Sequence, residues 1–172
     1  MMVVDQATGP GLPAQENPTR PTSRAEIARC TDLVALVDRR LAECRRVRQG
    51  LALLCIDVAG HDEWAHRHGP DVAQRLLQDL ALRLRGGLRQ HDEVRRLSVT
   101  RLAVLLCGAG EREALLVRAR LERVLAGPYR VGPWLLGPSV RVGCAASPPA
   151  PARGDTLVHL ATQSLDADVA AG

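Results

Sequence analysis

Three histidines and two aspartates lie close together in one short stretch, and side chains of these types can ligate a transition metal. His61, His66 and His68 follow Asp57 closely, and Asp62 lies among them. The string H-D-E-W-A-H-R-H lacks the H-E-x-x-H spacing that places two histidines on one helix face. A helix also brings residues seven positions apart together only loosely, so the sequence does not predict a metal site here.

The basic residues are the second group with chemical potential. All 23 are arginine, and the formal net charge at pH 7 is +4. This excess suits an anionic partner such as a nucleotide or an acidic protein, although a solvated surface is its commoner explanation. The arginine pairs at 39–40, 45–46 and 95–96 fall on different elements, and aromatic residues make up only 2% of the chain. Because single-stranded nucleic acid is bound largely by stacking, we expect no nucleic-acid partner.

The cysteines and the apolar segments bear on the compartment. The five cysteines are Cys30, Cys44, Cys55, Cys107 and Cys144. They are odd in number and form no C-x-x-C pair, so a reducing cytosol is the simplest environment. No uncharged apolar run reaches the roughly 18 residues of a membrane-spanning helix, and the N-terminus lacks the basic start of a secretory signal. We therefore expect a cytoplasmic protein without a membrane partner.

The elements that must position any site begin after a leader. Residues 1–22 are rich in proline and glycine and poor in large apolar side chains, which predicts a disordered leader or linker. Residues 23–172 form the single expected domain. Ser23 and Glu26 make a capping box that opens a helix over residues 23–48. The apolar run LALLCIDV at 51–58 predicts a strand buried on both faces.

The remaining pattern alternates helices with strands. Expected helices cover 61–68, 71–88 and 111–126, and Asp155 is expected to cap a final helix. Expected strands cover 93–97, 101–107, about 129–136 and 139–146, the first two joined as a hairpin. This order predicts an α/β (α+β) sandwich in which helices flank a central, mostly antiparallel sheet.

Four phrases stand in an order and spacing that resemble one bacterial family. They are LVALVDRR at 33–40, Ile56-Asp57-Val58, Arg96-Leu97 followed after five residues by AVLL at 103–106, and VGCA at 142–145. Together they resemble the GGDEF domain, the module that condenses two GTP molecules into cyclic di-GMP, over about residues 30–172. The resemblance implies a GGDEF or nucleotide-cyclase-like fold.

The family's five signature residues are replaced here by Ser98-Val99-Thr100-Arg101-Leu102. Glycines at the first two positions would let the hairpin approach a substrate, and Ser98 and Val99 lack that freedom. The acidic third residue, which binds metal in the family together with Asp57, is Thr100 here. A single carboxylate is a poor cage for Mg²⁺, so Asp57 would be a vestigial ligand or a strand-end cap.

The residues that bind guanine and phosphate in the family also have no counterpart at the matching positions. An asparagine and an aspartate that bind the base correspond to Ala65 and Gln74, and the lysine of the final helix has no equivalent in a chain without lysine. A base site that loses its polar partners loses most discrimination. The resemblance therefore implies a domain that is not an enzyme and needs no metal or other cofactor.

A second site of the family matches better. Many members carry an inhibitory product site, R-x-x-D, five residues before the signature, and Arg89-Gln90-His91-Asp92 stands there. A third residue of that site falls on Arg120, and Arg96 could add positive field. Arginine forks and a carboxylate suit the edges and phosphates of a guanine nucleotide. The alternative is a solvated turn pair worth under about 1 kcal/mol.

The sequence thus favours a catalytically inactive, cytoplasmic receptor for cyclic di-GMP. Its expected ligands are Arg89, Asp92, Arg120 and Arg96, and binding would promote dimerisation or change the contact with an unidentified protein partner. The first alternative is an interaction module on the same fold that binds no nucleotide. The second is residual diguanylate cyclase activity.

Overall fold

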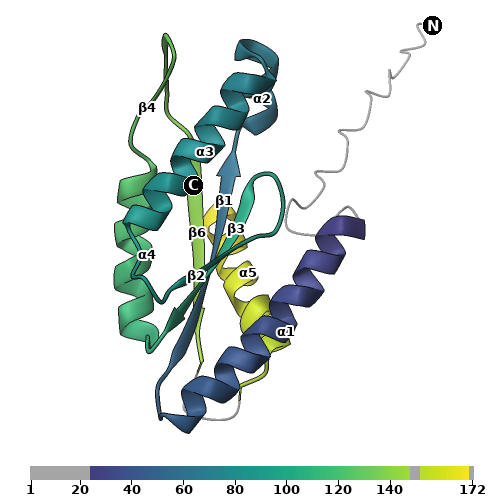
Figure 1. Ribbon diagram of the computed structural model, residues 1–172, viewed down its shortest axis with the longest axis vertical. Helices are drawn as coiled ribbons and strands as arrows, with labels where there is room; N and C mark the ends of the chain where they lie inside the picture. Colours follow the sequence, from purple (N-terminus) through teal and green to yellow (C-terminus); the bar gives the residue numbers. More distant parts are fainter. Residues whose placement is uncertain (1–23, 148–151, 171–172) are drawn as a thin grey trace, which may run out of the picture.

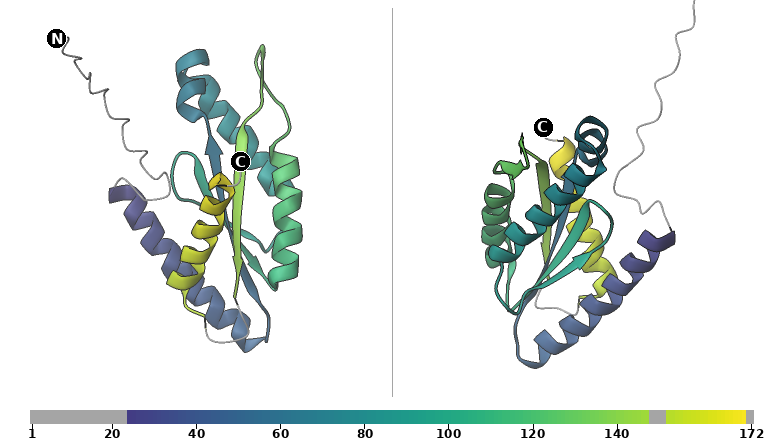
Figure 2. Two further views of the ribbon diagram at one scale, coloured as in Figure 1. Left: turned by 180° about the vertical axis from the view of Figure 1, so that it is seen from behind. Right: turned by 45° about the horizontal axis from the view of Figure 1, so that its top comes forward.

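The computed structural model describes residues 24–147 and 152–170, which Figures 1 and 2 show from three directions. The elements are α1 Arg24–Arg46, β1 Leu51–Ala59, α2 His61–His68, α3 Pro70–Gly86, β2 Glu93–Arg96, β3 Arg101–Cys107, α4 Glu111–Leu125, β4 Tyr129–Val131, β5 Trp134–Leu136, β6 Ser139–Ala146 and α5 Gly154–Ala170. The leader predicted for residues 1–22, and Ser23 of the predicted capping box, lie outside the described residues.

Four strands form the central sheet, in the order β2-β3-β1-β6. Each neighbouring pair is antiparallel, and β1 lies in the interior between β3 and β6 (Figure 1). Residues 51–58 of β1 are all buried, as expected for a continuous apolar run with both faces covered. The predicted α/β sandwich with a central antiparallel sheet is confirmed.

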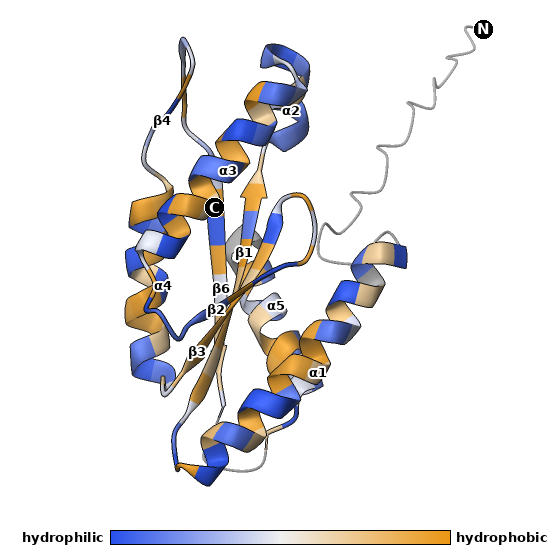
Figure 3. Cartoon of the chain, in the orientation of Figure 1, coloured by the Kyte–Doolittle hydropathy of each residue, from blue (hydrophilic) through white to orange (hydrophobic). Residues whose placement is uncertain are grey.

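The two faces of the sheet carry different helices. Because successive residues of a strand point to opposite faces, Leu54 and Ile56 pack with α3 and α4, whereas Leu53 and Cys55 pack with α1 and α5. Figure 3 shows apolar residues along the inner strands and hydrophilic residues over the outward helix faces. Among the described residues, no helix combines the length and apolarity that crossing a bilayer requires.

The phrase VGCA has a packing role. A Cβ atom on Gly143 would lie 2.4 Å from the carbonyl oxygen of Ala161, so only glycine allows α5 to lie this close to β6. Residue 143 sits in the middle of β6, next to β1. The close approach also brings α5 next to β1, the strand that carries Asp57 near its end.

Two local features differ from the expectation. The segment around 129–136 forms two short strands, β4 and β5, which pair in a separate two-stranded sheet. Helix α5 begins at Gly154, one residue before the expected cap. The Gly154 amide donates to Oδ1 of Asp38 on α1 over 2.6 Å, while Asp155 lies in the first turn and accepts from the Thr156 amide. A residue distant in sequence therefore contributes to the helix start.

Candidate functional site

Asp57 lies near the end of β1 between two arginines on the neighbouring strands. The sheet register places Arg101 of β3 opposite it on one side and Arg141 of β6 opposite it on the other. Arg101 Nε donates to Oδ1 over 3.2 Å, and Arg141 Nη2 donates to Oδ2. The Asp57 side chain is only 9% exposed. Both of its oxygens are thus engaged by cations of the chain itself.

The hairpin between β2 and β3 is held by its own polar groups. Ser98 Oγ accepts from the amides of Thr100 and Arg101, over 3.3 and 3.1 Å, and the Thr100 carbonyl accepts from the Val58 amide over 3.1 Å. Arg96 donates to the carbonyls of Ser98 and Val99 at 2.9 and 3.0 Å. The Arg96 guanidinium therefore braces this hairpin rather than the turn that contains Arg89.

A cavity of about 490 Å³ lies beside the hairpin and Asp57. Its lining combines apolar side chains such as Leu33 and Leu165 with the acids Glu26, Asp62 and Glu63. Cys55 also lines it, and burial raises the pKa of this thiol to about 12. At neutral pH the thiol is protonated, so it is a poor nucleophile. Of the two positions matched to guanine binding, Ala65 is partly buried on α2 and Gln74 is exposed on α3.

Arg89 and Asp92 form a turn between α3 and β2. Asp92 Oδ2 accepts from the Arg89 backbone amide over 2.7 Å, and the Asp92 amide donates back to the Arg89 carbonyl over 3.1 Å. The Arg89 side chain is exposed. The carboxylate thus fixes the turn through one oxygen, and the arginine side chain extends from a braced backbone.

Arg120 of α4 contacts the chain at the end of α3, two residues before this turn. Its Nη2 donates to the carbonyl of Gly87 over 2.6 Å, and its side chain is exposed. Gly87 also packs against α4, because a Cβ atom there would lie 2.9 Å from Leu121 Cδ2. The structure therefore brings Arg120 to the segment that carries Arg89 and Asp92. It places Arg96, the fourth predicted ligand, at the other end of β2, on the hairpin.

The histidines do not converge. His61 Nδ1 lies 3.0 Å from Asp62 Oδ1, and the His68 ring lies 4.6 Å from the Trp134 ring. His66 is exposed on α2. In the part of the chain that the structure describes, no group of three or more potential ligands is placed to hold a metal ion.

Sequence reasoning missed Arg141 as a partner of Asp57. The family phrases included the strand that contains Arg141 but gave it no role. The available signal was the count along the strands: an arginine two residues before Gly143 falls opposite Asp57 when β1 and β6 pair in this register. Pairing of β1 with β6, which lie far apart in sequence, had to be known first.

Comparisons with known proteins agree on one family. The family model described as "Diguanylate cyclase, GGDEF domain" matches residues 33–172. An uncharacterized protein, y4lL of Sinorhizobium fredii, is 30% identical over 150 residues, which cover 87% of this chain. The matched region spans 17% of that relative's length.

Solved structures show the same architecture. The GGDEF domain of PA1120 (TpbB or YfiN) from Pseudomonas aeruginosa superposes with a TM-score of 0.75 at 26% identity, over 83% of this chain and 84% of that one. The GGDEF domain of DgcB from Caulobacter crescentus, solved in complex with c-di-GMP, gives a TM-score of 0.71 at 14% identity, over 80% and 82% of the two chains. The second likeness concerns the fold alone.

Proposed function

Because the chain belongs to the GGDEF family of diguanylate cyclase domains, we propose that it is a catalytically inactive member that binds cyclic di-GMP at Arg89, Asp92 and Arg120. The observation that carries the proposal is the hydrogen bond from Arg120 to the Gly87 carbonyl. It joins α4 to the end of α3, two residues before the R-x-x-D motif. A domain of this fold, that of DgcB, has been solved with this nucleotide, so the ligand is compatible with the architecture.

The ion pairs of Asp57 support the loss of catalysis. A divalent metal would need the Asp57 oxygens, and both already accept from arginines while the Asp57 residue is buried. Thr100 supplies no second carboxylate, and Arg101 adds a positive charge that repels a cation. Without a metal, little in the described residues would activate the attacking hydroxyl or neutralise the leaving phosphate.

The chemistry of the turn supports nucleotide binding. Each guanidinium offers a planar fork that fits a phosphate or the O6/N7 edge of guanine. The Asp92 carboxylate can accept from the N1 and N2 groups of guanine, and its hydrogen bond to the Arg89 amide holds it in place. Arg96 is left out of the proposed ligand set, because its guanidinium donates to the hairpin carbonyls.

The proposal includes the compartment of this receptor and the way in which ligand binding is transmitted. All five cysteines are free thiols, as a reducing cytoplasm keeps them. Binding of cyclic di-GMP would be transmitted by dimerisation or by a changed contact with a protein partner. Calorimetric titration with cyclic di-GMP, GTP and GMP tests the proposal. We expect cyclic di-GMP to bind and GTP not to be turned over.

One observation favours a second candidate, an interaction module that binds no nucleotide. The Asp92 carboxylate and the Arg120 guanidinium already make hydrogen bonds that stabilise the turn without any ligand. If Asp92 and Arg120 served only to stabilise the turn, they would make these same hydrogen bonds. Absence of cyclic di-GMP binding in the titration would favour this second candidate.

A further inference from the structure

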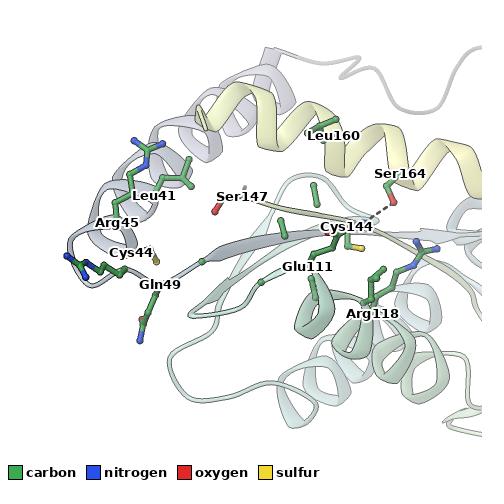
Figure 4. Close-up of a pocket in the computed structure, with 17 residues that line it drawn as sticks. Leu41, Cys44, Arg45, Gln49, Glu111, Arg118, Cys144, Ser147, Leu160 and Ser164 are labelled. Atoms are coloured by element: carbon green, nitrogen blue, oxygen red, sulfur yellow. Dashed lines mark hydrogen bonds between the residues drawn. The ribbon is translucent and has the colours of Figure 1, made fainter. Parts of the chain in front are cut away.

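Arginines line two cavities away from the sites described above. The larger cavity, of about 1080 Å³, lies along β6 between α4 and α5. Figure 4 shows Arg45 and Arg118 at opposite ends of it, so their guanidinium groups do not converge on one ligand. Its floor is also engaged, since the Cys144 amide donates to Ser164 Oγ over 3.2 Å. The smaller cavity, beside α1, has its arginines arranged differently.

This smaller cavity is a crevice of about 270 Å³ between α1 and the end of β2, and we call it the α1–β2 crevice. Its charged lining comes from both elements, namely Arg29, Asp32 and Arg39 of α1 and Arg95 and Arg96 of β2. The α1 positions recur at helical spacing, so they share one face of the helix. The fold thus brings together arginines from two pairs, 39–40 and 95–96, that lie on different elements.

Two guanidinium groups of the α1–β2 crevice are held by neutral acceptors. Arg29 Nη1 donates to the Leu97 carbonyl over 3.3 Å. Arg96 donates to the carbonyls of Ser98 and Val99 over 2.9 and 3.0 Å. A carbonyl orients a guanidinium without neutralising its charge. Because the three acceptors are consecutive residues, both arginines lie at the start of the hairpin, and each keeps N–H groups for an anion.

The remaining charges leave the crevice positive. Arg95 is compensated, because it pairs with Glu93 over 3.0 Å. Arg39 is exposed and has no acidic partner within the residues that the structure describes. Asp32 is the one acid in the lining. Together with the two arginines held by carbonyls, Arg39 makes three positive charges against one carboxylate. A ligand with two negative charges would balance them.

The length of the α1–β2 crevice favours a peptide over a free phosphate. Arg29 and Arg39 lie ten residues apart on α1, which is a rise of about 15 Å. A phosphate held by the two carbonyl-bound arginines leaves Arg39 unpaired, whereas an extended peptide covers about 13 Å in four residues. The volume of 270 Å³ is also below the roughly 300 Å³ at which pockets for small molecules begin.

We propose that the α1–β2 crevice binds a phosphorylated serine or threonine of a partner protein. The phosphoryl group carries close to two negative charges at pH 7, and Arg29 and Arg96 bind it through charge-assisted hydrogen bonds. An acidic residue about four positions away along the peptide pairs with Arg39. Arginine clusters recognise phosphorylated motifs in this way. The site shares no residue with the proposed nucleotide site, so it goes beyond cyclic di-GMP binding.

The test uses a labelled, capped peptide with a central phosphoserine, glutamate four positions to either side and alanine elsewhere. We expect saturable binding by fluorescence anisotropy. The same peptide with serine in the centre should bind at least about tenfold more weakly. Equal affinity of the serine peptide, or no binding of the phosphopeptide at millimolar concentration, overturns the proposal. Competition by free O-phosphoserine as strong as by unlabelled phosphopeptide would contradict a protein partner.

Three variants of α1 locate the site on the protein. Arg29→Ala should weaken phosphopeptide binding at least about tenfold. Arg39→Ala should weaken it about threefold, but should not affect a phosphopeptide with alanine in place of both glutamates, because the ion pair is then absent. Arg46→Ala, at an exposed arginine of α1 outside the crevice, is the matched control. An equal loss in Arg46→Ala and Arg29→Ala would indicate general attraction to a basic surface and contradict the site.

A further comparison separates this site from the proposed nucleotide site. Arg29→Ala should leave the affinity for cyclic di-GMP unchanged, and Arg120→Ala should leave phosphopeptide binding unchanged. Loss of phosphopeptide binding in Arg120→Ala would place the phosphoryl group beside Arg120 and contradict its assignment to the α1–β2 crevice. Failure of cyclic di-GMP to bind affects only the nucleotide site.

Discussion

Arg141 of β6 lies directly opposite Asp57 of β1, and its guanidinium donates to the Asp57 carboxylate. Arg101 donates to the other oxygen from β3. One buried carboxylate thus ties three neighbouring strands together at the end of the sheet where the family places its metal. The Asp57 carboxylate, a group that could ligate a metal ion, is here part of an ion-pair network within the sheet.

Removal of this carboxylate should destabilise the domain. Asp57→Asn leaves two partly buried guanidinium groups without their counter-charge, which should lower the free energy of unfolding on the order of 3 kcal/mol. Urea unfolding followed by circular dichroism measures the change. Asp62→Asn, at a fully exposed aspartate of α2, is the matched control and should change little. Unfolding of Asp57→Asn at the wild-type urea midpoint would show that the two ion pairs contribute nothing.

The protein should not make cyclic di-GMP. Incubation with GTP and either Mg²⁺ or Mn²⁺ should yield no product by chromatography. Thr100→Asp alone should not restore activity, because Arg101 still engages Asp57 and Ala65 still lacks a polar group for the base. Product above a protein-free blank, from either form, contradicts the proposed loss of catalysis.

Burial of the Cys55 thiol should make stability depend on pH in the alkaline range. Its pKa is raised by burial from 9.0 to about 12, so above pH 9 the unfolded chain releases a proton that the folded chain keeps. The free energy of unfolding should therefore fall as pH rises through this window, by about 1 kcal/mol from this group at pH 10. Urea unfolding at pH 8 and pH 10 measures it.

Cys55→Ala supplies the comparison for that experiment. The variant loses some stability at both pH values because a buried sulfur is removed, but its decrease between them should be smaller than that of the wild type. An identical decrease would place the titration on other groups.

Asp38 should stabilise the start of α5. Asp38→Ala removes the acceptor of the Gly154 amide and should cost about 1 kcal/mol in the free energy of unfolding. Asp32→Ala, an exposed aspartate of the same helix, is the control and shares the change in helix propensity. Equal losses in the two variants would mean that the contact with α5 carries no net stability.

Much of the fold was predictable because its signals are local. The run 51–58, the helical spacing of 61–68 and 111–126, and the hairpin around Ser98 depend on apolar period and turn residues within each segment. Asp38 and Arg141 could not be assigned their roles in the same way. Each contacts a residue more than eighty positions away in the sequence. Such contacts follow from the tertiary arrangement and leave no local signal.

The candidate nucleotide site shows the same division. Arg89 and Asp92 follow from a four-residue motif, and Arg120 was placed by counting along the chain. The bond from Arg120 to Gly87 brings α4 to the chain two residues before Arg89, a contact that counting alone could not predict. Arg96 was expected beside them, but a neighbouring hairpin with carbonyls within reach competes for its guanidinium.

Isothermal titration calorimetry of the full chain with cyclic di-GMP shows whether the nucleotide binds at Arg89, Asp92 and Arg120. We expect saturable binding by the wild type. Arg89→Ala and Arg120→Ala should each weaken it by about a hundredfold, since a lost charge-assisted hydrogen bond costs about 2–3 kcal/mol. Arg112→Ala, at an exposed arginine in the first turn of α4, should bind as the wild type does. Wild-type protein that binds no cyclic di-GMP at high micromolar concentration, or an Arg120→Ala variant with wild-type affinity, would show that the nucleotide is not bound by these residues.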